Sequence, residues 1–283
     1  MINEFVEPGH FYSVIPKITG DYNVNDPIFS ELDYNDANHI AILNEISGFL
    51  TMFDETFGAS NASDRQKQHK YTLPNGAFEW MDARMLHYFI QKKRPNKIIE
   101  IGSGNSTLLM ENTKQMFGLN TMITCIEPYP MEFLNEMHAS GKINLITDRL
   151  ENIDLAMFQT LEENDILFID SSHVAKLGSD VMYYFTKIFP LLKKGVNVHI
   201  HDIFFPFDYP LDWLKEGRFW NEQYLLYVFL QYNTKYKIQF CNSYSGYKFG
   251  DQLKKIQENS YEINTGVTTD VFSGGSIWLS VQE

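Results

Sequence analysis

The sequence lacks most of the features that would define its class at once. Only two of its 283 residues are cysteines, Cys125 and Cys241, which lie far apart and form no CxxC pair. This excludes a disulfide framework and a zinc knuckle. No stretch approaches the roughly 18 consecutive apolar residues of a membrane helix, and the N-terminus carries acids where a signal peptide carries positive charge. These absences predict a cytoplasmic protein without a membrane segment.

Positive charge is also scarce. The chain has 23 Lys and Arg against 36 Asp and Glu, which gives a net charge of −13. Because phosphate backbones bind through clustered Lys and Arg, we expect no nucleic-acid partner. What is present is the composition of an ordinary globular protein, 44% hydrophobic and 21% charged.

The N-terminal part is predicted to be an extension of the main domain. Residues 1–35 are rich in Pro, Gly, Asn and Asp and form an irregular arm. Residues 37–53 place apolar side chains every three or four positions, which predicts an amphipathic helix, and a polar loop follows to residue 76. We therefore expect an arm and helix over 1–76 and a main domain over 77–283. The residues available to anchor the arm are Phe11, Tyr12, Val14 and Ile15.

Beyond residue 97, short apolar runs alternate with helical patterns. This alternation predicts an α/β fold with a doubly wound, mostly parallel, seven-stranded sheet. We expect the last two strands to form an antiparallel hairpin at the edge, with a loop between them. The predicted strands are 98–101, 121–126, 143–146, 165–170, 195–200, 236–240 and 276–281.

Ligands of open α/β sheets bind at the carboxyl ends of the strands. The first strand ends in the segment EIGSGNST, in which Gly102 and Gly104 permit a tight turn before a helix. Ser106 or Thr107 occupies the place of the third glycine of a dinucleotide-binding loop, which argues against NAD. A carboxylate at Glu100 suits the amino-acid part of S-adenosylmethionine better than a pyrophosphate.

Two further strand ends suit an adenosine. Glu127 follows the second strand about 25 residues after the glycine turn, where a carboxylate can bind the hydroxyls of a ribose. After the third strand, Asp148 and Arg149 lie where an adenine amino group would be held. Alternatively, these are surface residues that cap a helix or a loop.

The fourth and fifth strands end in acids and histidines. We expect Asp170, His201 and Asp202 to meet at one edge of the sheet, where they could hold a divalent cation such as Mg²⁺ or Mn²⁺. His173 would stand beside the cation and accept a proton from a substrate hydroxyl. His199, one pleat further in, is expected to be a buried, hydrogen-bonded histidine. Loop capping by these acids is the alternative.

The segment 204–213 is rich in aromatic residues and follows the cation candidates directly. It could form a wall over an acceptor pocket, since aromatic faces pack well on sugar rings. Core packing of a long loop explains the same residues. The side chains expected opposite this wall are Arg218, Trp220, Asn221 and Glu222.

Taken in series, these motifs resemble the class I S-adenosylmethionine-dependent methyltransferases. Within that class they resemble a bacterial branch grouped with macrolide-sugar O-methyltransferases and cephalosporin hydroxylase-like proteins. The likeness covers most of the chain. The segments that carry it are EIGSGNST, IEP, DILFIDSSHVAKLGSD, HIHDIFFPFDYP and WNEQYLLYVFL, with PGHFYSVIP and SGGSIWL near the two ends.

The resemblance implies roles for particular residues. More distantly, the strand ends are similar to those of catechol O-methyltransferase, and the likeness assigns Asp170, His201 and Asp202 to a metal and His173 to the base. Two histidines here replace an acid and a lysine of that pattern. Glu127 would bind the ribose of the cofactor, and the residues around its methionine part would be Glu100, Gly102, Ser103 and Asn105.

We therefore expect a methyltransferase that uses S-adenosylmethionine to modify an oxygen of a small polyhydroxylated acceptor such as a sugar. One alternative is an NAD(P)-dependent sugar oxidoreductase or epimerase, although the third glycine and a Tyr–Lys pair are missing from their usual places. Another is a non-catalytic binding protein on the same fold. The aromatic arm and long helices would also suit a homo-oligomer.

Overall fold

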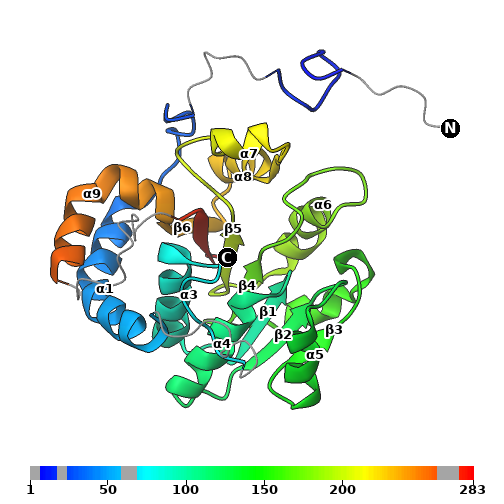
Figure 1. Cartoon of the computed structure of the whole chain (residues 1–283). Coiled ribbons are helices and arrows are strands. Elements are labelled where there is room, and N and C mark those ends of the chain that lie inside the picture. The colour runs from blue at the N-terminus through cyan, green and yellow to red at the C-terminus, as the bar shows by residue number, and fades with distance from the viewer. Residues whose placement is uncertain (1–6, 18–23, 59–68, 260–273) are drawn as a thin grey trace.

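In a computed structural model, which describes residues 7–17, 24–58, 69–259 and 274–283, a central sheet lies between two layers of helices (Figure 1). The strand order is β3-β2-β1-β4-β5-β7-β6, and only β7 runs antiparallel to its neighbours. The predicted α/β fold with a mostly parallel seven-stranded sheet is confirmed. Its strands are β1 Lys97–Ile101, β2 Met122–Ile126, β3 Asn144–Ile146, β4 Ile166–Ile169, β5 Asn197–His201, β6 Tyr236–Cys241 and β7 Ser276–Val281.

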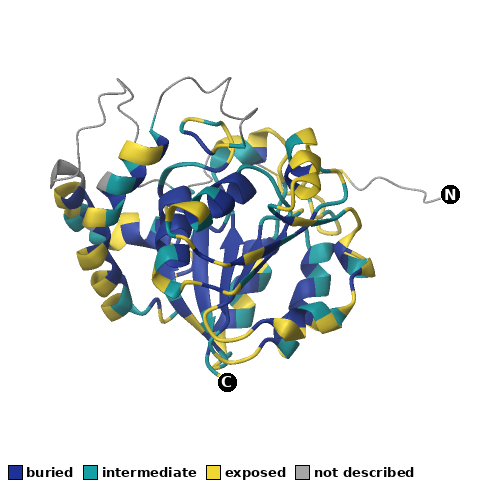
Figure 2. Cartoon of the chain, turned by 90° about the horizontal axis from the view of Figure 1, so that it is seen from below, coloured by how far each residue is buried: buried dark blue, intermediate teal, exposed yellow. Residues whose placement is uncertain are grey.

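The helices cover both faces of the sheet, and the central strands are therefore buried, as Figure 2 shows. Alternate strand residues belong to different cores: Ile98 packs with the helices on one face, and Ile99 packs with those on the other. The helices are α1 Asp36–Phe57, α3 Trp80–Lys93, α4 Asn105–Met116, α5 Glu132–Ala139, α6 Asp180–Tyr183, α7 Leu211–Lys215, α8 Glu222–Gln231 and α9 Asn242–Asn259.

The predicted N-terminal helix is present as α1, which packs against α3, α9 and β6. Three of the four expected anchors of the arm are wrong, because Phe11, Tyr12 and Val14 are at least 77% exposed, whereas Ile15 is partly buried. Phe29 and Tyr34 are buried instead, and Tyr34 donates a hydrogen bond to the Phe29 carbonyl over 2.5 Å. The boundary between residues 76 and 77 stays a prediction.

The C-terminal part differs from expectation in one element. The long helix α9 connects β6 and β7 where a loop was predicted, and residues 260–273 of that connection lie outside the described residues. The edge pairing itself is confirmed, since β6 and β7 are antiparallel neighbours. No helix in the described ranges has the length and apolar character needed to cross a membrane.

The strand order reverses between β1 and β4, and the loops that follow these two strands touch there. Gly102 has φ 77°, and a Cβ on it would lie 1.8 Å from the Asp170 carbonyl oxygen. Only glycine fits such an approach. This contact places the glycine turn and the first acidic strand end side by side, at the position where α/β sheets bind ligands.

Candidate active site

Two adjoining cavities open at the carboxyl edge of the sheet, with volumes of about 430 and 610 Å³. After the ligands predicted from the sequence, we call the smaller one the nucleoside cavity and the larger one the acceptor cavity. They share Gly102, Glu127 and Asp170. Together they collect all of the predicted site residues except Glu100 and Asp148. The predicted residues in their walls are Gly102, Ser103, Gly104, Asn105, Glu127, Asp170, His173, His201 and Asp202.

Glu127 links the segments that follow β1 and β2 through hydrogen bonds. Its carboxylate accepts a hydrogen bond from the Ser103 backbone N–H over 3.2 Å and another from the Tyr129 backbone N–H over 2.9 Å. The glycine turn therefore lies against the end of β2, and the free N–H groups of α4 begin directly after it. Glu127 faces both cavities, as expected for a residue that binds a ribose.

Glu100 is not in the wall of either cavity. It is fully buried, and it accepts hydrogen bonds from Ser106 over 2.6 Å, from Thr107, and from Cys125 over 3.3 Å. Burial raises the pKa of Glu100 to about 7. In this position the side chain of Glu100 holds the first turn of α4, and its predicted role toward the cofactor stays a prediction.

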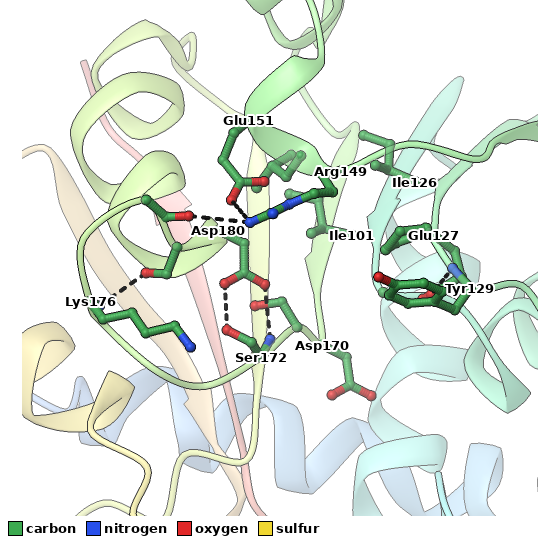
Figure 3. A pocket seen from close by; sticks show the side chains of 16 residues that line it. Ile101, Ile126, Glu127, Tyr129, Arg149, Glu151, Asp170, Ser172, Lys176 and Asp180 are labelled. Carbon is green, nitrogen blue, oxygen red and sulfur yellow. Dashed lines mark hydrogen bonds and ion pairs between the residues drawn. The ribbon is translucent and has the colours of Figure 1, made fainter. Parts of the chain in front are cut away.

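Asp148 is also placed differently from the prediction. It is exposed, and its carboxylate accepts hydrogen bonds of 2.7 Å from Asn152 and from the Arg149 backbone N–H, which lower its pKa. The nucleoside cavity is lined instead by Arg149, Leu150 and Glu151 (Figure 3). Arg149 and Glu151 form an ion pair of 2.9 Å there.

The acids and histidines of the fourth and fifth strand ends do meet. His173 Nε2 lies 3.4 Å from an oxygen of Asp170 and 3.4 Å from an oxygen of Asp202. His201 Nε2 lies 3.6 Å from the other Asp202 oxygen. His173 and Asp202 have φ values of 58° and 56°. Such left-handed conformations are costly for these residues, and they cluster at functional sites.

Burial and neighbouring charges shift the pKa values of these acids and histidines. Burial raises the pKa of Asp202 to about 6. For His173, burial works in the opposite direction, but the Asp170 and Glu222 carboxylates outweigh it and bring the pKa well above its usual range. The pKa of His201 is also raised, since Asp202 and Asp170 outweigh its burial.

His199 is buried as predicted, but it is not hydrogen-bonded. It stacks on Phe168 at 4.1 Å and lies edge-on to Trp278 at 4.8 Å. Neither ring nitrogen has a hydrogen-bond partner among the described residues. Burial lowers the pKa of His199 well below its usual value, so this histidine behaves as an aromatic core residue.

The predicted aromatic wall contributes part of the acceptor cavity. Trp213 of this wall lines the cavity together with Trp220, which was predicted opposite the wall, and the Arg218 guanidinium lies 4.8 and 5.7 Å from their ring centroids. Glu222 was also predicted opposite the wall but is fully buried and lines neither cavity. The segment Gly76–Phe78 closes the cavity from the opposite side. Sequence reasoning missed this segment, because it precedes the sheet and carries no catalytic residue type.

Comparisons with known proteins agree with this geometry. A family model described as a methyltransferase domain matches residues 99–203, from within β1 to just beyond β5. An uncharacterised protein of Archaeoglobus fulgidus is 33% identical over 175 residues, which is 58% of this chain and 77% of that protein.

Solved structures are similar at low identity. The SAH-bound methyltransferase PaMTH1 of Podospora anserina has a TM-score of 0.48 and 12% identity, covering 89% of this chain and 98% of its own. An O-methyltransferase from Bacillus cereus in complex with SAH has a TM-score of 0.41 and 12% identity, covering 86% and 91%.

The strand order, the glycine turn at the switch point and the matching family model together define the class. Residues 99–203 match the methyltransferase family, and the sheet with its glycine turn has the fold of the class I S-adenosylmethionine-dependent methyltransferases. The oxidoreductase alternative is therefore not supported. The particular bacterial branch within the class stays a prediction.

Proposed function

We propose that this protein transfers the methyl group of S-adenosylmethionine to an oxygen of a small polyhydroxylated acceptor such as a sugar. One observation carries the proposal: the nucleoside and acceptor cavities adjoin at Gly102, Glu127 and Asp170. A cofactor whose adenosine fills the first cavity would extend its methionine part along the glycine turn into the second cavity and present its sulfonium methyl there.

For the cofactor, we propose that Glu127 binds the ribose hydroxyls and that the turn from Gly102 to Asn105 surrounds the methionine part. The adenine would lie against Arg149–Glu151, since these residues line the cavity and Asp148 does not. Glu100 would act indirectly by holding the turn through Ser106 and Thr107.

For the acceptor, we propose that Trp213 and Trp220 pack on the sugar ring and hold a hydroxyl in line with the methyl. The oxygen–carbon bond would form as the carbon–sulfur bond breaks. In its neutral form, His173 would accept the hydroxyl proton at Nε2, which faces this space between Asp170 and Asp202. The carboxylates that raise the pKa of His173 would stabilise the imidazolium that results.

The same residues fit a divalent cation. Ligand atoms of Asp170, His173 and Asp202 all lie within 4.8 Å of one another, and two carboxylates with an imidazole suit Mg²⁺ or Mn²⁺. We propose that Asp170 and Asp202 hold the cation, with His201 beside Asp202. When bound, it would polarise the acceptor hydroxyl and offset the acidic charge around His173.

Isothermal titration with S-adenosylhomocysteine and with NAD tests the cofactor, and methyl transfer from radiolabelled S-adenosylmethionine to a panel of sugars and phenols tests the acceptor. We expect binding of S-adenosylhomocysteine alone and transfer to a sugar hydroxyl. Binding without transfer to any member of the panel would favour a non-catalytic binding protein. Binding of NAD alone would overturn the proposal.

A further inference from the structure

A carboxylate that lines neither cavity contacts the proposed base. Glu222, the first residue of α8, is fully buried, which is rare for glutamate unless it is paired. One of its oxygens accepts a hydrogen bond from His173 Nδ1 over 2.7 Å. The other accepts a hydrogen bond from the Tyr184 hydroxyl.

The backbone supports this contact. The N–H groups of Asn221 and Glu222 donate to the His173 carbonyl over 3.1 and 3.2 Å. The Asn221 amide also binds Ala175, accepting from its N–H over 2.6 Å and donating to its carbonyl over 3.2 Å. The start of α8 thus fixes the loop that carries His173, and it holds His173 at its positive φ.

Tyr184, the second side chain that contacts Glu222, lies in a segment of unusual backbone conformation. Tyr184 begins a π-helical segment, Tyr184–Ile188, that continues α6. π-turns are rare, and they occur frequently at functional sites. Here the widened turn contains the residue whose hydroxyl reaches the second oxygen of Glu222.

We infer that Glu222 is a positioning residue that acts through His173. Carboxylates accept hydrogen bonds, so the ring nitrogen facing Glu222, Nδ1, carries a proton. The imidazole is thereby fixed in one orientation, with Nε2 facing Asp170 and Asp202 at 3.4 Å from each. Partners of this kind set the orientation and basicity of a functional histidine. The consequence for catalysis rests on the proposed function, but the contact itself does not.

Proton NMR of the protein labelled with ¹⁵N-histidine tests the contact without any acceptor. We expect a low-field, exchange-protected ring N–H signal in the wild type that is lost in His173→Asn and in Glu222→Ala. The signal should persist in Glu55→Gln, an exposed glutamate of α1 far along the chain from the site. Absence of the signal from the wild type, or its persistence in Glu222→Ala, would overturn the inference.

A double-mutant cycle tests the consequence for the rate. Glu222→Gln keeps the shape of the side chain, and we expect it to lower kcat roughly 10–100-fold while the affinity for S-adenosylhomocysteine stays unchanged. In the His173→Asn background the same substitution should have no further effect. Additive losses would mean that Glu222 acts elsewhere. If the wild type does not bind S-adenosylhomocysteine, the proposed function fails, and the NMR result still decides the inference.

Discussion

The nucleoside and acceptor cavities share a wall but are assembled in different ways. The ends of the parallel strands β1 to β4 and the segments that follow them supply the wall of the nucleoside cavity, so the register of the sheet places these segments. The acceptor cavity combines strand ends with Gly76–Phe78, Trp213 and Trp220, which come from separate parts of the chain. The comparison teaches that the cofactor side follows from the sheet, whereas the acceptor side depends on long loops.

The largest expected effect comes from Gly102, one of the three residues that lie in both walls. Gly102→Ala would place a Cβ 1.8 Å from the Asp170 carbonyl oxygen at a positive φ, so both loops must move. We expect loss of S-adenosylhomocysteine binding and a destabilisation of about 2–4 kcal/mol, measured by calorimetry and urea unfolding. Gly48→Ala is the control. Gly48 lies inside α1 with no atom near its Cβ position, so this change should stabilise the protein by about 0.5–1 kcal/mol.

A change confined to the acceptor cavity should separate rate from cofactor binding. His173→Ala removes the proposed base, and we expect kcat to fall by a factor of about 10²–10⁴ with the affinity for S-adenosylhomocysteine unchanged. Single-turnover methyl transfer and calorimetry measure the two effects. A kcat within a few fold of wild type would remove this role from His173.

A change at the proposed ribose contact should instead lower the affinity for the cofactor and leave the rate unchanged. Glu127→Gln weakens the proposed contact with the ribose, and we expect the affinity for S-adenosylhomocysteine to fall roughly 10–100-fold, as for loss of a hydrogen bond to a charged group. At saturating cofactor, kcat should stay close to that of the wild type. A lower kcat with unchanged affinity would show that the two cavities do not divide the work as proposed.

The smallest effect on the site should come from a histidine remote from both cavities. Burial lowers the pKa of His87 to about 4, so the folded protein binds this proton less readily than the unfolded chain. Its contribution to stability is present above about pH 6.5 and is lost as the pH falls from there towards 4.

Replacement of His87 should therefore change stability and leave the site alone. In His87→Phe, the drop in unfolding free energy between pH 7 and pH 5 should shrink by about 2 kcal/mol, measured by urea titration. Binding of S-adenosylhomocysteine at pH 7 should not change. An equal pH dependence in the two proteins would mean that His87 stays neutral in the unfolded chain or is charged in the fold.

The sequence predicts the sheet and the strand-end residues well, because alternating patterns and strand ends are local signals. Glu100 shows the limit of such reasoning. It lies two residues after Ile98 and therefore on the same face of β1, the face that the core with α4 covers. The two-residue period of a strand could therefore have predicted that the side chain of Glu100 points away from the cavities.

Other parts of the site have no local signal. The contact of Glu222 with His173 joins residues that are 49 positions apart and depends on where α8 begins. The exposed Val228 and Tyr232 show the same difficulty. The spacing of four residues between them suits one apolar face of a helix, yet Leu226 and Leu230 form the buried side of α8. Only the packing of α8 on the sheet decides which face is inside.

The strand β7 has a consequence for synthesis of the protein on the ribosome. It pairs with β5, the strand that carries His201, yet it comes after β6 in the chain. Until residues 276–281 have emerged, β5 and β6 each expose an edge of unpaired backbone N–H and C=O groups, which other chains can join. We therefore expect a chain that ends before residue 276 to aggregate.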